Sequence, residues 1–297
     1  MPSDVVPSFL IIGAAKCGTT TVYNYLKEHP QVAMCQAKEP RYFAFQDAPP
    51  DPSDPIMAES ICDPETYRDA FTVNALTRAT GEASPIYLAH PDAYRAIHAH
   101  NPQMKLIAVL RDPSERAFSH FLMSQRQGFE PENDFIKAIG NPVVRFGNWR
   151  RERPYIPYSK YGRDLEKFLS VFPQSQLLVL FSQELKRDPD GTLRKLTDFL
   201  EVEPLEPGAP RRDNVGYAVR QPGLERLIRQ ANQLGISRLM PASLKSTLRG
   251  ILRKSNKTER RMTPQERRAA LDLLIPDIEK TERLLGIDLT IWKYTNP

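Results

Sequence analysis

A lysine and three consecutive threonines near the start of the chain form a pattern that can bind an anionic group. An apolar run over residues 9–12 leads into Gly13-Ala14-Ala15-Lys16-Cys17-Gly18-Thr19-Thr20-Thr21. A buried strand, a tight loop and a helix N-terminus in this order bring backbone N–H groups and the positive end of the helix dipole together. The sequence therefore predicts an anion cradle in which Lys16 is a fixed positive charge and the threonine hydroxyls donate further hydrogen bonds.

The spacing of this loop is close to that of a nucleotide-binding P-loop. Gly13 and Gly18 have the separation of the two P-loop glycines, and Thr20 stands where that motif has Ser or Thr. Thr19, however, occupies the position of the P-loop lysine. A P-loop kinase is one alternative, although no acidic strand end suited to Mg²⁺ accompanies the loop. A non-catalytic nucleotide-binding protein is another.

Polar residues also stand at the ends of two later predicted strands. Residues 105–110 form a continuous apolar strand pattern that ends at Arg111, and residues 80–84 end in Glu82-Ala83-Ser84-Pro85. Ligands of open parallel sheets bind outside the carboxyl ends of the strands, so we expect these groups to share one rim with the loop. Arg111 offers a bidentate fork to phosphate oxygens. Ser119, about two helical turns further on, can donate to the same anion.

A parallel sheet covered by helices has to position these residues. We expect strands at 9–13, 31–34, 80–84, 105–110 and 176–181, of which 105–110 is the clearest apolar run. Between them, helical spacing predicts helices at 19–28, 64–71, 92–100, 113–125, 161–172 and 191–200. This alternation is typical of a three-layer α/β fold with a P-loop-like parallel sheet. We expect a single domain over residues 1–297, with a core at about 8–202 and a basic, helical C-terminal elaboration at about 203–297 that contains no strand.

Composition and charge limit the classes of function. The chain has 297 residues, is 40% hydrophobic and carries a net charge of +5, which suits an anionic ligand but does not by itself indicate nucleic-acid binding. Three cysteines without metal-ligand spacing favour a reducing compartment. Neither a signal peptide nor a membrane-spanning apolar run stands out. We therefore expect a cytoplasmic protein that needs no metal.

These motifs resemble the sulfotransferases that use 3′-phosphoadenosine 5′-phosphosulfate (PAPS). Residues 12–21 are similar to the 5′-phosphosulfate loop of that family, and residues 111–120 to its 3′-phosphate motif. The string Lys38-Glu39-Pro40-Arg41-Tyr42-Phe43 looks like the branch that includes heparan sulfate sulfotransferases and varied bacterial members. Ala83 departs from that branch, which often has lysine between the acidic residue and Ser/Thr-Pro.

The resemblance implies a role for each of these residues. Lys16 would stabilise the leaving phosphate, Glu39 would be the general base for an acceptor hydroxyl, and Lys38 would assist electrostatically. The donor would transfer its sulfuryl group directly and in line, leaving 3′-phosphoadenosine 5′-phosphate (PAP), to a carbohydrate, lipid or small molecule. The residues expected to bind the donor are Lys16, Cys17, Gly18, Thr19, Thr20, Thr21, Arg111, Ser119 and, in a loosely matched late loop, Arg211 and Arg212.

The segment 238–261 is strongly basic. It carries eight basic residues against the single acidic Glu259, with leucines and isoleucines at near-helical spacing. A helical lid with a solvated basic face is the simpler interpretation. A surface that binds an anionic acceptor or anionic lipid headgroups is the alternative. The sequence leaves the acceptor and the oligomeric state open.

Overall fold

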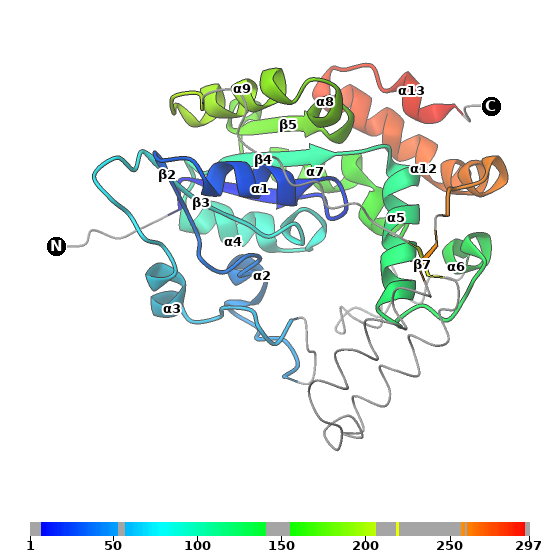
Figure 1. Cartoon of the computed structure of the whole chain (residues 1–297), viewed down its shortest axis with the longest axis horizontal. Coiled ribbons are helices and arrows are strands. Elements are labelled where there is room, and N and C mark those ends of the chain that lie inside the picture. Colours follow the sequence, from blue (N-terminus) through cyan, green and yellow to red (C-terminus); the bar gives the residue numbers. More distant parts are fainter. Residues whose placement is uncertain are drawn as a thin grey trace. The chain divides into compact units, whose positions relative to one another are not determined.

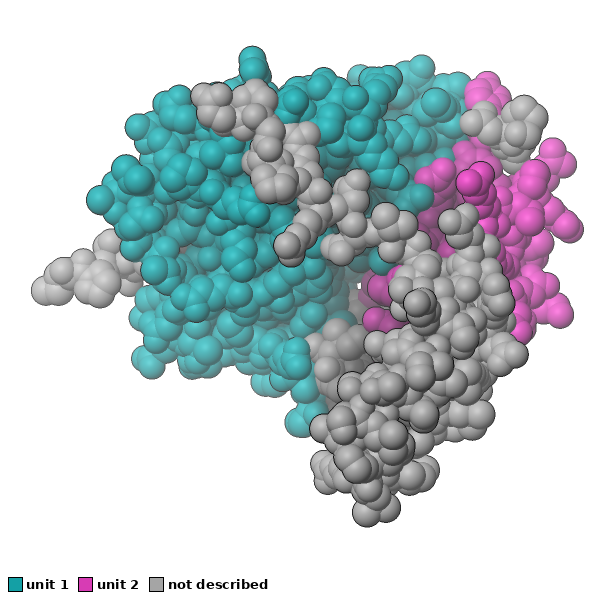
Figure 2. Space-filling model, viewed as in Figure 1, with its two compact units in different colours: residues 1–113, 160–213, 276–292 teal, residues 114–159, 214–275, 293–297 magenta. Residues whose placement is uncertain are grey.

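The computed structural model describes residues 7–52, 57–140, 155–205 and 260–294, together with two short strands at 218–219 and 257–258. The chain divides into two compact units (Figure 2). Unit 1 comprises residues 1–113, 160–213 and 276–292, and unit 2 comprises residues 114–159, 214–275 and 293–297. The expectation of one domain with a core at about 8–202 stays a prediction.

Unit 1 is built on a parallel β-sheet flanked by helices, as predicted (Figure 1). Five strands lie in the order β2-β3-β1-β4-β5, and every neighbouring pair is parallel. Their bounds are β1 (Phe9–Gly13), β2 (Val32–Met34), β3 (Ala79–Ala83), β4 (Lys105–Leu110) and β5 (Leu177–Phe181). Each strand lies within two residues of its predicted position.

The central strands form the core of the sheet. All five residues of β1 are buried, and in β4 only Lys105 is partly exposed. A strand covered on both faces reads as a continuous apolar run, which is why the sequence pattern of these strands is unambiguous. Ala14, just beyond β1, donates its N–H to the Val109 carbonyl at 2.9 Å. The loop after β1 therefore begins beside the carboxyl end of β4.

The helices of unit 1 include those predicted between the strands and two short ones that were not. The predicted helices are α1 (Thr19–Lys27), α3 (Pro64–Asp69), α4 (Ala93–His100), α7 (Tyr161–Leu169) and α9 (Pro189–Leu200). The additional helices are α2 (Tyr42–Phe45) and α8 (Ser182–Arg187); 3₁₀ turns lie at Tyr87–Ala89 and Gln174–Gln176. A helix of one turn has no room for a 3.6-residue apolar period, so α2 leaves no sequence pattern.

Unit 2 contains most of α5 (Pro113–Arg126), together with α6 (Phe135–Gly140), a 3₁₀ turn at Pro157–Ser159 and part of α12 (Pro264–Leu285). Its described core is aromatic, with Phe118, Phe121, Phe135 and Tyr155 in mutual ring contact. The expectation that no strand follows Val202 is wrong. The short strands β6 (Ala218–Val219) and β7 (Lys257–Thr258) pair antiparallel, and two-residue strands are too brief to give an alternating pattern.

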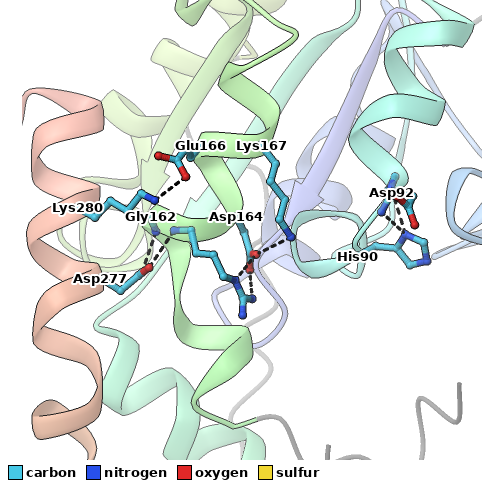
Figure 3. Close-up of polar contacts among 10 residues, drawn as sticks. His90, Asp92, Gly162, Asp164, Glu166, Lys167, Asp277 and Lys280 are labelled. Carbon is cyan, nitrogen blue, oxygen red and sulfur yellow. Dashed lines mark hydrogen bonds and ion pairs between the residues drawn. The ribbon is translucent and has the colours of Figure 1, made fainter. Parts of the chain in front are cut away.

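Helix α7 receives its N-terminal cap from a distant part of the chain (Figure 3). Asp277, in the part of α12 that belongs to unit 1, accepts hydrogen bonds from the Gly162 N–H at 2.8 Å and the Arg163 N–H at 2.9 Å. A Cβ on Gly162 would lie 2.8 Å from the Asp277 carbonyl oxygen, so only glycine allows this approach. Lys280 adds an ion pair to Glu166. These contacts join the C-terminal part of α12 to α7. A last short helix, α13 (Thr290–Lys293), comes after α12 in the chain.

Among the described residues, no helix is both long enough and apolar enough to span a membrane.

Candidate functional site

The loop between β1 and α1 has the backbone form that an anion cradle requires. Gly18 ends it in a left-handed conformation, with φ of 102°, and its carbonyl accepts the N–H of Thr21 at 3.0 Å. Lys16 is also left-handed, with φ of 74°. A non-glycine residue in this region costs on the order of 1–3 kcal/mol and is found where the surroundings impose it, often at functional sites.

Helix α1 presents its N-terminus at this loop. Its first three residues are Thr19, Thr20 and Thr21, and no acidic residue or capping side chain occupies the first turn. The positive end of a nine-residue helix therefore lies beside Lys16 and three hydroxyl groups. Cys17 is buried and its Sγ lies 3.5 Å from the Tyr161 hydroxyl. Its side chain packs in the core, so any contact of residue 17 with an anion would come from its backbone.

A second loop, which we call the base loop (residues 38–41), contacts the first turn of α1. Lys38 Nζ donates to Thr20 Oγ1 at 2.9 Å and lies 3.8 Å from Glu39 Oε1. Arg41 Nη2 donates to Glu39 Oε2 at 3.0 Å. The Glu39 carboxylate thus lies between two cations, one of which reaches the first turn of α1. The structure brings Lys38, Glu39 and Thr20 together; the roles assigned to them stay predictions.

The backbone of the base loop is unusual at two positions. Glu39 has φ of 59° and Arg41 has φ of 55°, so both non-glycine residues are left-handed. The Pro40 carbonyl accepts the Ile61 N–H at 2.9 Å, and helix α2 begins directly after Arg41. Two such residues separated by one proline indicate that the surrounding contacts determine the direction in which the Glu39 side chain points.

Beneath the base loop lies a buried carboxyl group, Glu82, near the end of β3. It is fully buried and accepts hydrogen bonds from the hydroxyls of Tyr87 at 2.5 Å, Ser84 at 2.8 Å and Tyr67 at 3.4 Å. The pKa of Glu82 is raised to about 7, chiefly by burial and least by the charge of Glu39, against the lowering effect of the three hydroxyls. The sequence predicts Glu82 at this rim of the sheet but indicates no role for it.

Arg111 follows the last residue of β4 and is partly buried. It belongs to unit 1, and its place at a carboxyl strand end next to β1 agrees with the rim expected from the sequence. Ser119 lies in α5, within unit 2, and is also partly buried. Arg211, Arg212 and most of the basic segment 238–261 lie outside the described residues. The roles assigned to these residues stay predictions.

The described part of the chain contains no cluster of histidine, cysteine and acidic side chains arranged to hold a metal ion. The site as described is an assembly of cations, hydroxyls and one partly exposed carboxylate at the carboxyl edge of a parallel sheet. Such a set can bind an anionic group at Lys16 and α1, and can accept a proton at Glu39 a short distance away.

One protein-family model matches more than half of the chain. Residues 7–207 match the model described as the sulfotransferase family. This range includes both loops, Glu82, Arg111 and Ser119.

Two curated relatives carry related names. The chain is 29% identical over 201 residues to heparan sulfate glucosamine 3-O-sulfotransferase 3B1 of Mus musculus, covering 68% of the chain and 47% of that protein. It is 28% identical over 209 residues to bifunctional heparan sulfate N-deacetylase/N-sulfotransferase 2 of Homo sapiens, covering 68% of the chain and 23% of that protein. The match thus spans less than half the length of either relative.

A solved structure agrees over almost the whole chain. The crystal structure of a sulfotransferase from Alicyclobacillus acidocaldarius superposes with a TM-score of 0.71 and 25% sequence identity. The match covers 97% of this chain and 99% of the other.

Proposed function

The chain belongs to the sulfotransferase family, and on this premise we propose that it transfers the sulfuryl group of PAPS to a hydroxyl group. The observation that carries the proposal is the contact between the base loop and the first turn of α1. Lys38 links Thr20, in the first turn of α1, to Glu39. A donor anion held at α1 and a proton acceptor at Glu39 would therefore lie on either side of one lysine.

The first loop supplies what the donor needs. The α1 N-terminus and the hydroxyls of Thr19, Thr20 and Thr21 would hold the 5′-phosphosulfate. Lys16 would stabilise the negative charge that develops on the phosphate oxygen as the sulfur–oxygen bond breaks. Arg111 would bind the 3′-phosphate, and Arg211 or Arg212 the same end of the nucleotide; the phosphate-binding role expected of Ser119, in unit 2, rests on the sequence alone. Fixed cations neutralise the leaving phosphate in this scheme, so the reaction needs no metal ion.

Glu39 is the proposed general base. The acceptor oxygen forms a bond to sulfur, its proton passes to the Glu39 carboxylate, and PAP leaves with the electron pair of the broken sulfur–oxygen bond. Lys38 and Arg41 flank the carboxylate and keep it oriented. A side chain that is about one third exposed, as that of Glu39 is, remains accessible to an acceptor from solvent.

The acceptor we propose first is a carbohydrate hydroxyl, because both curated relatives are named for heparan sulfate and one of them is named a 3-O-sulfotransferase. Lipid and small-molecule hydroxyls are the alternative acceptors to be tested.

The three cysteines are all free thiols, which supports the proposal of a cytoplasmic location.

Ligand-dependent unfolding separates the proposed function from its rivals. PAP should raise the melting temperature of the protein, by the equivalent of about 2.7 kcal/mol at a hundred times its dissociation constant, whereas ATP with Mg²⁺ should not. The reverse order would favour a kinase and overturn the proposal. Transfer of ³⁵S from labelled PAPS to heparan sulfate, chemically desulfated heparan sulfate, a glycolipid or a simple phenol then identifies the acceptor class.

Replacement of Glu39 tests the assignment of the base. Glu39→Gln should leave PAP binding unchanged and lower turnover by roughly a hundredfold or more, the range for a positioned general base. The matched control is Glu65→Gln, which removes an exposed carboxylate from α3. Equal turnover in the two variants would remove Glu39 from the mechanism. PAP binding without transfer to any acceptor would favour a non-catalytic nucleotide-binding protein.

A further inference from the structure

The backbone N–H groups of Arg41 and Phe43 are each connected to the buried Glu82 carboxyl by one bridging hydroxyl group. The Arg41 N–H donates to Ser84 Oγ at 2.9 Å, and Ser84 Oγ donates to Glu82 at 2.8 Å. The Phe43 N–H donates to the Tyr87 hydroxyl at 3.3 Å, which donates to Glu82 at 2.5 Å. These two N–H groups flank Tyr42, the first residue of α2.

These two bridged connections hold a segment of backbone that has an unusual conformation. Arg41 is left-handed and so is Glu39, two residues earlier. The hydroxyl of Ser84 accepts the peptide N–H of Arg41. The guanidinium of the same arginine donates to the Glu39 carboxylate at 3.0 Å. A side chain locked by such contacts presents its functional atoms in one orientation.

All members of this arrangement are buried. Glu82, Ser84 and Tyr87 have no exposed surface, and Arg41 and Phe43 are nearly covered. Water cannot take the place of a lost hydrogen-bond partner at such buried positions. If an N–H lost its acceptor, the backbone would therefore shift until the N–H met another acceptor. The charged and titratable groups facing Glu82 are Tyr67, Tyr87, Cys35 and Glu39.

We infer that Glu82, Ser84 and Tyr87 are positioning residues that set the orientation of Glu39 by anchoring the backbone of residues 41–43. None of the three would touch donor or acceptor. The inference rests on the proposed role of Glu39 as the base. It adds that the orientation of the Glu39 side chain depends on the buried carboxyl of Glu82 and on the hydroxyls of Ser84 and Tyr87.

Hydrogen exchange of the Arg41 amide tests the anchoring without donor or acceptor. In Ser84→Ala, NMR with ¹⁵N-labelled arginine should show exchange of this amide about tenfold faster than in the wild type, as expected for the loss of one buried hydrogen bond. Ser84→Thr keeps the hydroxyl and should restore slow exchange. Exchange in Ser84→Ala at the wild-type rate would overturn the inference.

Turnover then tests whether the anchor positions the base. Tyr87→Phe should lower kcat by about tenfold to a hundredfold, because small misplacements of reacting groups have effects of this size, while PAP affinity stays unchanged. Tyr67→Phe is the matched control. It also removes a hydroxyl bound to Glu82, but within the described parts of the chain Tyr67 accepts no hydrogen bond from the backbone of residues 38–43. An equal fall in kcat in both variants would refute positioning through residues 41–43.

The two tests separate this inference from the proposed function. If the wild type transfers no sulfuryl group to any acceptor, the proposed function fails whatever the exchange rates are. If transfer occurs and the exchange or kcat pattern differs from that expected, only the positioning role fails.

Discussion

Replacing Glu82 by glutamine should make the stability of unit 1 much less dependent on pH. Burial raises the pKa of Glu82 from its ordinary 4.5 to about 7 in the folded protein. Between these values the unfolded chain releases the proton and the folded protein keeps it, so stability is greatest below pH 4.5 and falls as pH rises toward 7. At about 1.4 kcal/mol per pKa unit, the whole loss is on the order of 3–4 kcal/mol, and most of it falls between pH 5 and 8.

Glutamine has the shape of the protonated carboxyl and cannot ionise. Glu82→Gln should therefore lack this loss. Above pH 7 it should be the more stable protein as long as its amide oxygen accepts from the Tyr87 hydroxyl and its NH2 group donates to Ser84 Oγ. Other titrating groups, such as His90 with its pKa lowered to about 4 by burial, are present in both proteins and cancel when the two pH profiles are subtracted.

The assay is urea unfolding from pH 5 to pH 8, followed by the fluorescence of Trp292. This residue packs against Tyr161 and Phe181 and so reports on unit 1. Trp149, the second tryptophan of the chain, is replaced by phenylalanine in both proteins. Glu65→Gln controls for the loss of one carboxylate at an exposed position. Parallel pH profiles for the wild type and Glu82→Gln would show that Glu82 does not retain its proton, and would refute the reasoning.

Three further changes test other parts of the structure. Lys16→Ala should reduce sulfuryl transfer severely while the circular dichroism spectrum stays that of the wild type; near-normal turnover would contradict its role at the leaving phosphate. Arg111→Ala should reduce discrimination between PAP and the analogue without the 3′-phosphate, measured by calorimetry, and unchanged discrimination would place Arg111 elsewhere. Gly162→Ala should lower the free energy of unfolding by about 1–3 kcal/mol, because its Cβ would lie 2.8 Å from the Asp277 backbone; the control is Gly140→Ala, where a Cβ meets nothing within 4 Å.

The sheet could be predicted because its signals are local. Strands β1 and β4 are continuous apolar runs, and polar residues follow each one directly. The rule that ligands bind at the carboxyl ends of parallel strands then places Lys16 and Arg111 on the same edge without further information. The family resemblance pointed to the same residues, and the family match agrees with it.

The support beneath Glu39 could not be predicted, because it depends on contacts between distant residues. The hydrogen bond from Arg41 to Ser84 joins positions 43 apart in the sequence. The left-handed conformations of Glu39 and Arg41 occur in residue types that do not signal them, unlike glycine at position 18. Glu82 was visible as a polar residue at a strand end, but its burial and its three hydroxyl partners follow only from the tertiary structure.

The cap that Asp277 provides for α7 has a consequence for the order in which the protein is synthesised. The capped N–H of Gly162 precedes its partner by 115 positions, and residues 114–159 and 214–275, which belong to unit 2, interrupt unit 1. A ribosome that has made all five strands of the sheet has therefore not yet made the carboxylate that completes α7. Unit 1 cannot reach its final contacts as a nascent chain until residues 276–292 have left the exit tunnel. Domains generally fold as units during synthesis, and here the unit that carries both loops of the proposed site must wait for a segment encoded far downstream.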